Sequence, residues 1–220
     1  DGKPGNRPID VGTGLALFMS NVASPTFRDH VITFSANPHI RHLTGSLKSR
    51  INHINDDGGY NTDYYKMHNA VANMCVDNRV DPEDIPTIVV FTDGNFDTFD
   101  VNAKGNAWNT THQKIQSLWA SKGVTRIPTI VVWNLNPALA GQHARSDTPG
   151  IMQLQGQSPS LFKYILYGET LPDIQQTIMV DGLATKVTVS STDPYAIYRK
   201  AMDNHEYFEP LLKILDRSQE

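Results

Sequence analysis

The chain has 220 residues, with 19 lysines and arginines against 23 aspartates and glutamates, and therefore a formal net charge of −4. This length can bury a hydrophobic core, and a hydrophobic content of 39% excludes a disordered chain. The slight acidic excess argues against a general nucleic-acid-binding surface, which needs surplus lysine and arginine to release counterions, although a local basic patch stays open.

A helix, two short strands and a second helix are predicted at the start of the chain. Pro8 suits the first turn of a helix over residues 9–21, because an N–H has no partner at that position. Short β-rich runs at 31–34 and 39–43 indicate two strands. Apolar residues at helical spacing between 47 and 54 predict the second helix, which a glycine-rich turn ends.

The middle of the chain alternates between strand and helix patterns. This rhythm predicts a three-layer α/β fold with a mostly parallel sheet and helices on both of its faces. The predicted elements are a helix over 63–78, strands over 87–92 and 127–133, a helix around 115–119, a strand over 151–155 and a helix over 161–166.

Two of these strands carry the same six residues. The sequence Ile-Pro-Thr-Ile-Val-Val occurs at 85–90 and again at 127–132. Continuous β-branched runs are typical of strands buried on both faces. We interpret the pair as two central strands of one parallel sheet, and not as an internal repeat.

After Gly168 the rhythm changes. Residues 1–167 are predicted to form the α/β domain, and residues 168–220 a C-terminal appendage packed on it. Within the appendage, 185–189 indicates an edge strand or hairpin arm, and two helical patterns follow.

The single cysteine, Cys75, excludes an intrachain disulfide and a cysteine-rich zinc site. A single cysteine with no second one to pair with favours a reducing compartment, so we expect an intracellular, cytoplasmic protein. No apolar run approaches the roughly 20 residues that a membrane-spanning helix requires, and no membrane partner is expected.

Polar, glycine-containing loops follow the predicted strands, where ligands bind in open parallel sheets. They are residues 56–63, residues 93–109 and the loop after Trp133. The first two combine glycine with hard oxygen donors, which suit magnesium, manganese or calcium better than zinc or copper. The candidate residues are Gly59, Asn61, Thr62, Asp93, Gly94 and Asn95.

The segments Gly-Gly-Tyr-Asn-Thr at 58–62 and Val-Val-Phe-Thr-Asp-Gly at 89–94 resemble a von Willebrand factor A-type domain over residues 1–167. That family holds a divalent metal on top of a parallel sheet, at its metal-ion-dependent adhesion site. The resemblance implies that Thr62 and Asp93 are metal ligands for Mg²⁺ or Mn²⁺. It also implies that Gly59, Asn61, Gly94 and Asn95 line the ligand-binding surface.

The first motif of that family, Asp-x-Ser-x-Ser, is absent from the chain. Residues 1–21 look like the loop and helix that follow the motif in relatives. We therefore expect the first strand and three metal ligands to lie upstream of Asp1, which leaves the metal site incomplete in this chain. The alternative is a degenerate member that never bound metal.

A narrower resemblance covers residues 8–133 and Asp193-Pro194-Tyr195 near the end. It is to the C-terminal region of an uncharacterised family of plants, fungi, amoebae and giant viruses, distantly related to Ro ribonucleoproteins. The relation implies that any helical RNA-binding region lies upstream, so RNA would bind there and not to this chain.

Plainer interpretations remain for every candidate. Thr62 and Asp93 suit helix caps and turns through hydrogen bonding alone. Histidines such as His39, His42 and His68 are by default exposed or hydrogen-bonded, and Cys75 is expected to be a buried thiol. The chain contains no nucleophile elbow, dinucleotide fingerprint or phosphate-binding loop.

Three functions follow in order of preference. The first is a non-enzymatic protein-interaction module whose metal ion binds a carboxylate of a partner protein. The second is a structural part of a ribonucleoprotein. The third is a nucleotide or phosphoryl enzyme, which ranks last because the phosphate-binding motifs are missing.

Overall fold

The structure is a computed structural model that describes residues 7–33, 38–55, 64–93, 107–136, 149–158, 162, 165 and 173–190. In chain order its elements are α1 (Pro8–Val22), β1 (His30–Ile32), β2 (Ile40–His42), α2 (Leu47–Asn55), α3 (Tyr64–Asp77), η1 (Pro82–Asp84), β3 (Ile88–Thr92), α4 (Ala107–Ser121), β4 (Ile130–Asn134), β5 (Ile151–Gln155), β6 (Asp173–Val180) and β7 (Leu183–Ser190). The predicted helices of the tail after residue 190 lie outside the described residues, and of the helix predicted over 161–166 only Phe162 and Ile165 are described, both helical.

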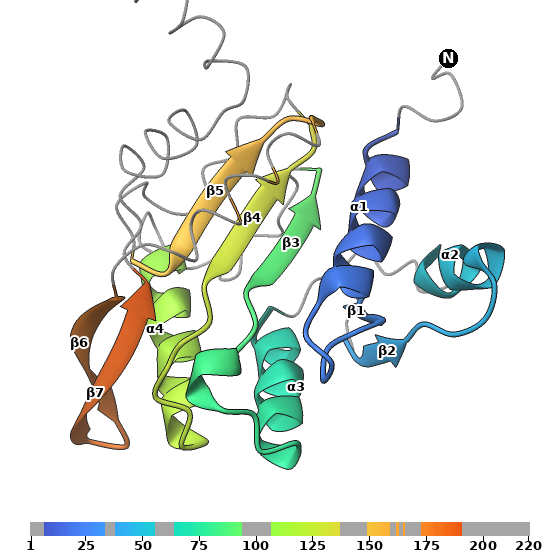
Figure 1. Cartoon of the computed structure of the whole chain (residues 1–220). Helices are drawn as coiled ribbons and strands as arrows, with labels where there is room; N and C mark the ends of the chain where they lie inside the picture. The colour runs from blue at the N-terminus through green and yellow to red at the C-terminus, as the bar shows by residue number, and fades with distance from the viewer. Residues whose placement is uncertain are drawn as a thin grey trace, which may run out of the picture.

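The centre of the fold is a parallel sheet in the order β3-β4-β5 (Figure 1). The two Ile-Pro-Thr-Ile-Val-Val runs lie side by side in it, because Ile88 pairs with Ile130 and Val90 with Val132. The predicted pairing in one parallel sheet is therefore confirmed, as is a mixed α/β fold.

Apolar side chains cover both faces of this sheet. Those on one face pack with α3 and α4, around the fully buried Trp119. Those on the other face, which include Trp133, pack with α1 and with Phe162. Alternate residues of a strand point to opposite faces, so one apolar run supplies both clusters.

Helix α1 lies close to the sheet. A Cβ atom on Gly12 would come within 3.1 Å of Leu135 Cδ1 and 3.5 Å of Phe91 Cβ, so the glycine permits this approach. At Gly14, by contrast, a Cβ would meet nothing within 4 Å.

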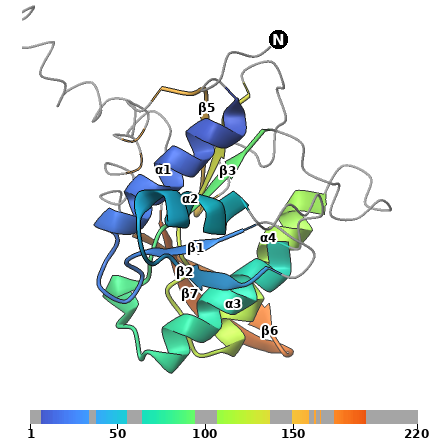
Figure 2. The same ribbon diagram turned by 90° about the vertical axis from the view of Figure 1, so that its right-hand side faces the viewer.

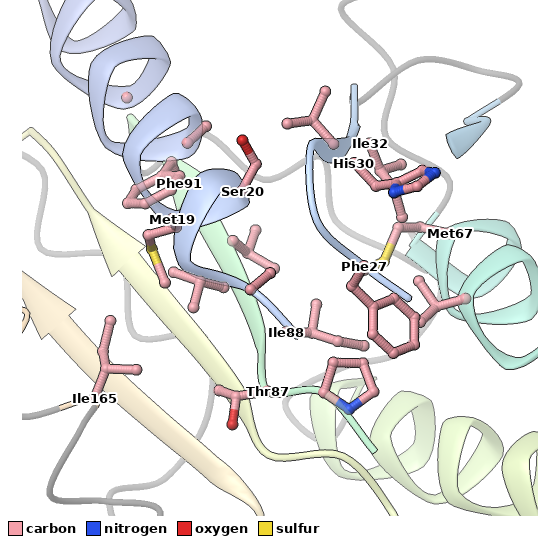
Figure 3. A pocket seen from close by; sticks show the side chains of 18 of the residues that line it. Met19, Ser20, Phe27, His30, Ile32, Met67, Thr87, Ile88, Phe91 and Ile165 are labelled. Atoms are coloured by element: carbon pink, nitrogen blue, oxygen red, sulfur yellow. The ribbon is translucent and has the colours of Figure 1, made fainter. Parts of the chain in front are cut away.

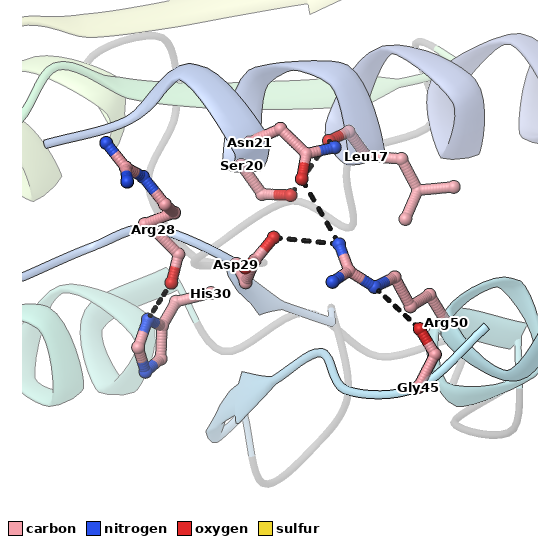
Figure 4. A network of polar contacts seen from close by, with 8 residues as sticks. All are labelled: Leu17, Ser20, Asn21, Arg28, Asp29, His30, Gly45 and Arg50. Atoms are coloured by element: carbon pink, nitrogen blue, oxygen red, sulfur yellow. Dashed lines mark hydrogen bonds and ion pairs between the residues drawn. The ribbon is translucent and has the colours of Figure 1, made fainter. Parts of the chain in front are cut away.

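Strands β1 and β2 pair antiparallel and form a second, separate sheet, which lies with α2 beside α1 (Figure 2). Arg50 of α2 ties this unit to α1 (Figure 4). Its Nη1 donates to Asp29 Oδ1 at 2.8 Å and to Asn21 Oδ1 at 3.1 Å, while its Nε donates to the Gly45 carbonyl at 3.3 Å. The guanidinium therefore fixes the small sheet relative to the end of α1.

Strands β6 and β7 form a hairpin whose turn, Asp181-Gly182, has positive φ at both residues, as two-residue hairpin turns require. The hairpin joins the main body, since Ile127 donates its N–H to the Thr188 carbonyl at 2.9 Å. Val187 and Val189 are buried in the core beside α4. The strand predicted over 185–189 is thus one arm of this hairpin, while the boundary at residue 168 stays a prediction.

One sequence expectation about burial was wrong. The run 87–92 was predicted to be buried on both faces, yet in β3 only Val90 is buried and its neighbours are half-buried. All five residues of β4 are buried, as predicted. Among the described strands, β3 lies at the edge of the parallel sheet and pairs on one side, whereas β4 lies between β3 and β5.

Candidate functional site

The carboxyl ends of the three parallel strands lie level with one another. Thr92 pairs with Asn134, and Asn134 pairs with Gln155. Two backbone bonds continue this edge past the strands: Leu135 donates to the Thr92 carbonyl at 2.7 Å, and Gly156 to the Asn134 carbonyl at 2.8 Å. A row of neutral side-chain oxygens therefore follows the edge where ligands bind in such sheets.

Asp93 adds the charge. It follows Thr92 directly, at the end of the edge strand β3, and it is exposed. Of the site residues predicted from the sequence, Asp93 is the one among the described residues. Thr62, Gly59, Asn61, Gly94 and Asn95 lie outside the described residues, so their meeting with Asp93 stays a prediction.

Asn134 is a residue of this edge that sequence reasoning did not single out. It is buried, and its Oδ1 accepts the Asn136 N–H at 2.9 Å, which fixes the start of the loop after β4. The loop itself was identified from its place after Trp133. The signal for Asn134 was its position, as a polar residue closing an apolar run with a second asparagine two residues later.

The described residues contain no group of three or more histidine, cysteine, aspartate or glutamate side chains able to hold a metal ion. The donor set at the edge consists of one carboxylate with hydroxyl and amide oxygens, which is the chemistry that Mg²⁺ and Mn²⁺ prefer. Such ions take about six oxygens, so Asp93 needs further ligands from elsewhere.

A large cavity, about 1800 Å³ in volume, runs beside β3 (Figure 3). It begins near Asp93 and Arg7 at the carboxyl end and reaches Thr87 at the other end of the strand. Its walls are mainly apolar and include Met19 of α1, Ile32 of β1, Met67 of α3 and Ile88 and Phe91 of β3.

An exposed ion pair stands at the carboxyl mouth of the cavity. The Arg7 guanidinium donates to both carboxylate oxygens of Asp10, at 2.9 and 2.8 Å. This hydrogen bonding lowers the pKa of Asp10 below its usual value. The two charges of this pair offset each other, and Asp93 borders the same cavity.

The sequence matches, over residues 2–202, the family described as a domain of unknown function, DUF7788. The chain belongs to this family. It is also 26% identical over 167 residues to "Uncharacterized protein L728" of Acanthamoeba polyphaga mimivirus, across 74% of this chain and 28% of that protein. The DUF7788 chain thus spans about a quarter of the length of that relative.

No solved structure matches the chain. The mimivirus match agrees with the expected relation to giant-virus proteins. Membership of the von Willebrand factor A-type or Ro groups stays a prediction.

The buried histidines of the DUF7788 chain are uncharged. Trp119 donates its indole N–H to His68 Nδ1 at 3.3 Å, and burial, helped by repulsion from nearby His112, lowers the pKa of His68 to about 3. Burial likewise lowers the pKa of His112, although the Pro149 carbonyl 3.1 Å from its Nε2 works in the opposite direction. Both rings lie in the core beneath the sheet, and so His68 and His112 serve packing and hydrogen bonding.

Cys75 is buried on α3, as predicted, and burial raises the pKa of its thiol to about 11. It therefore stays protonated at neutral pH and is unsuited to nucleophilic chemistry. Separately, none of the helices that the structure describes is long and apolar enough to span a bilayer.

Proposed function

We propose that this chain is a non-enzymatic protein-interaction module, and that the carboxyl edge of its sheet holds Mg²⁺ or Mn²⁺ in the intact protein. The observation that carries the proposal is the exposed Asp93 carboxylate at the end of β3, beside a row of neutral oxygens. The resemblance to von Willebrand factor A-type domains supplies the rest: a three-layer fold, Thr62 as a second ligand, and a first motif upstream.

The chemistry of the edge supports a binding role. A bound divalent cation is the largest local charge, so it can attract a partner carboxylate to a surface that is otherwise polar and neutral. On this proposal Asp93 holds the ion and an open coordination position receives the partner. Thr92 and Asn134 keep the strand ends in place, since their backbones form the bonds that close the edge.

The described residues offer little support for catalysis. Burial keeps His68 and His112 neutral, and Cys75 is a buried thiol with a raised pKa. All three side chains are also buried, so none of them presents an acid, a base or a nucleophile at the carboxyl edge. A binding module needs only the carboxylate, the ion and a rigid sheet.

Isothermal calorimetry of Mg²⁺ binding by the intact protein tests the proposal. Asp93→Ala should weaken Mg²⁺ affinity by about tenfold or more, because it removes the charged ligand. Asp84→Ala is the matched control, since this exposed carboxylate lies near the opposite end of β3. Equal Mg²⁺ affinity in the Asp93→Ala variant and the unmodified protein would overturn the assignment.

A further inference from the structure

Two histidines face each other across the small antiparallel sheet. His30 of β1 is the direct register partner of His42 of β2. One position further along, Leu43 donates its N–H to the Asp29 carbonyl at 2.7 Å, and hydrogen-bonded pairs alternate with non-bonded pairs along an antiparallel ladder. His30 and His42 are therefore a non-hydrogen-bonded pair, the kind in which the side chains of opposite residues lie closest.

The two imidazole rings stack on one face of this sheet. Their centroids are 4.7 Å apart and their planes are inclined by 22°. Two nitrogens that bind one tetrahedral zinc ion, at the usual Zn–N length, lie about 3.3 Å from each other. His42 is exposed, so a change of its side-chain torsions can bring a ring nitrogen to that spacing without moving either strand.

Hydrogen bonding fixes which nitrogen of His30 is available to a ligand. Its Nδ1 lies 2.8 Å from the Arg28 carbonyl, which can only accept, so Nδ1 carries the proton (Figure 4). In the neutral ring the lone pair is then on Nε2. A carbonyl on the second ring nitrogen is what orients metal-binding histidines and raises their basicity. Within the described residues, no hydrogen bond engages His30 Nε2 or either ring nitrogen of His42.

The positive charges around the pair point away from it. The Arg28 guanidinium extends away from the His30 ring, while the Arg28 carbonyl meets Nδ1 (Figure 4). Arg41 precedes His42 in β2, so its side chain lies on the opposite face of the sheet. There its Nη1 donates to the His53 carbonyl at 2.8 Å. A cation at the histidine pair therefore meets two neutral rings and not a guanidinium.

The small sheet would gain from a link between its strands. Each strand is three residues long, and the two form a separate two-stranded sheet. An isolated pair of strands is at best marginally stable in water. An ion held by both imidazoles would join β1 to β2 through two coordinate bonds, and its binding would stabilise the folded state increasingly with its concentration.

We propose that His30 and His42 together bind a divalent transition-metal ion such as Zn²⁺, which cross-links β1 to β2. Imidazole nitrogens suit such ions, whereas Mg²⁺ and Mn²⁺ prefer oxygen. The described residues contain no group of three or more histidine, cysteine, aspartate or glutamate side chains able to hold a metal, so these two supply the ligands there. A tetrahedral zinc then keeps two positions for water or for a donor from a bound molecule.

This site is separate from the proposed magnesium site. Its ligands are nitrogens of β1 and β2, whereas Asp93 follows β3 and supplies oxygen. An excess of Mg²⁺ should therefore leave the Zn²⁺ affinity unchanged, and either site can fail without the other. Displacement of Zn²⁺ by Mg²⁺ would place the zinc on oxygen ligands and overturn the proposal.

Calorimetric titration of residues 1–220 with Zn²⁺ tests the pair directly. His42→Phe keeps an aromatic ring to stack on His30 but removes the ligand nitrogen, so it should weaken Zn²⁺ affinity by about tenfold or more. His39→Phe is the matched control, because His39 is exposed directly ahead of β2 and its Nε2 already accepts from Arg41 Nε at 3.2 Å. Unchanged affinity in His42→Phe, or an equal loss in both variants, would overturn the site.

Thermal denaturation measures the cross-link itself. In EDTA, His42→Phe should unfold at about the same temperature as the unmodified chain, because the ring stacking survives. Added Zn²⁺ should raise the thermal midpoint of the unmodified chain and of His39→Phe, but not that of His42→Phe. An equal rise in all three would assign the stabilisation to zinc bound elsewhere.

Nitrogen-15 spectra of the histidine rings identify the ligand atoms. Zn²⁺ should shift the Nε2 resonance of His30 and one ring nitrogen of His42 together, and both shifts should saturate at one ion per chain. His30 Nδ1 should keep its proton throughout. Shifts at His39 or His53 in place of this pair would contradict the assignment.

Discussion

The same six residues lead into strands β3 and β4, yet the two strands lie in different environments. In β4 every residue from Ile130 to Asn134 is buried, whereas in β3 only Val90 is. The difference lies in their neighbours, because β4 pairs on both sides and β3, among the described strands, on one. A β-branched run therefore reports that a segment can enter a sheet interior, and the order of strands decides whether it does.

The strongest test of this comparison replaces, one at a time, two aromatic residues that pair in register with alanine. Trp133→Ala in β4 should lower the free energy of unfolding by about 3–5 kcal/mol, the usual loss for a fully buried aromatic residue. Its half-buried partner in β3 is Phe91, whose ring centroid lies 5.5 Å from that of Trp133. Phe91→Ala should lower the free energy of unfolding by about half as much. Urea denaturation of residues 1–220 measures both, and equal losses would contradict an edge position for β3.

Acid should weaken the core that both strands share. Burial holds the pKa of His68 at about 3 against an ordinary value of 6.5, so the unfolded chain binds more protons than the folded one between these limits. Stability is then complete above pH 6.5 and falls as the pH drops through this window, by about 2 kcal/mol at pH 5.

Urea denaturation at pH 7 and at pH 5 measures this loss. His68→Gln is the comparison variant, since it keeps a polar side chain beside Trp119 without a titrating ring. The difference between the two pH values should shrink in that variant. An unchanged difference would assign the acid sensitivity to other groups, such as His112.

The smallest effect concerns the contact of α1 with β3. Gly14→Ala should raise the free energy of unfolding by up to about 1 kcal/mol, because alanine favours a helix and the position is open. The free energy of unfolding of Gly12→Ala should be about 1 kcal/mol lower than that of Gly14→Ala, since the new Cβ would press on Leu135 and Phe91. Thermal denaturation compares the two, and equal gains would mean that α1 can move off the strand.

Sequence reasoning predicted well whatever a local pattern determines. The helices starting at Pro8 and Leu47 and the strands around Val90 and Val132 follow from proline placement and apolar spacing, which act within a few residues. The parallel pairing of the two identical runs followed from their composition alone.

The rest depends on contacts between distant parts of the chain. The edge position of β3 depends on strand order, and the burial of His68 on Trp119, 51 residues away. The role of Asn134 depends on the hydrogen bond that its Oδ1 accepts from the Asn136 N–H, at the start of a loop whose shape no periodicity predicts. At the candidate site, Asp93 was found from its motif, and its place at the carboxyl edge followed from the parallel sheet.

The buried thiol of Cys75 has a practical consequence. It is the only cysteine in the sequence, and its raised pKa keeps it unreactive toward maleimides at neutral pH. The unmodified protein is therefore a silent background for thiol labelling. A single Ile32→Cys or Val89→Cys substitution would introduce the one reactive handle, so that fluorophores or spin labels report on either wall of the cavity without first removing a native cysteine.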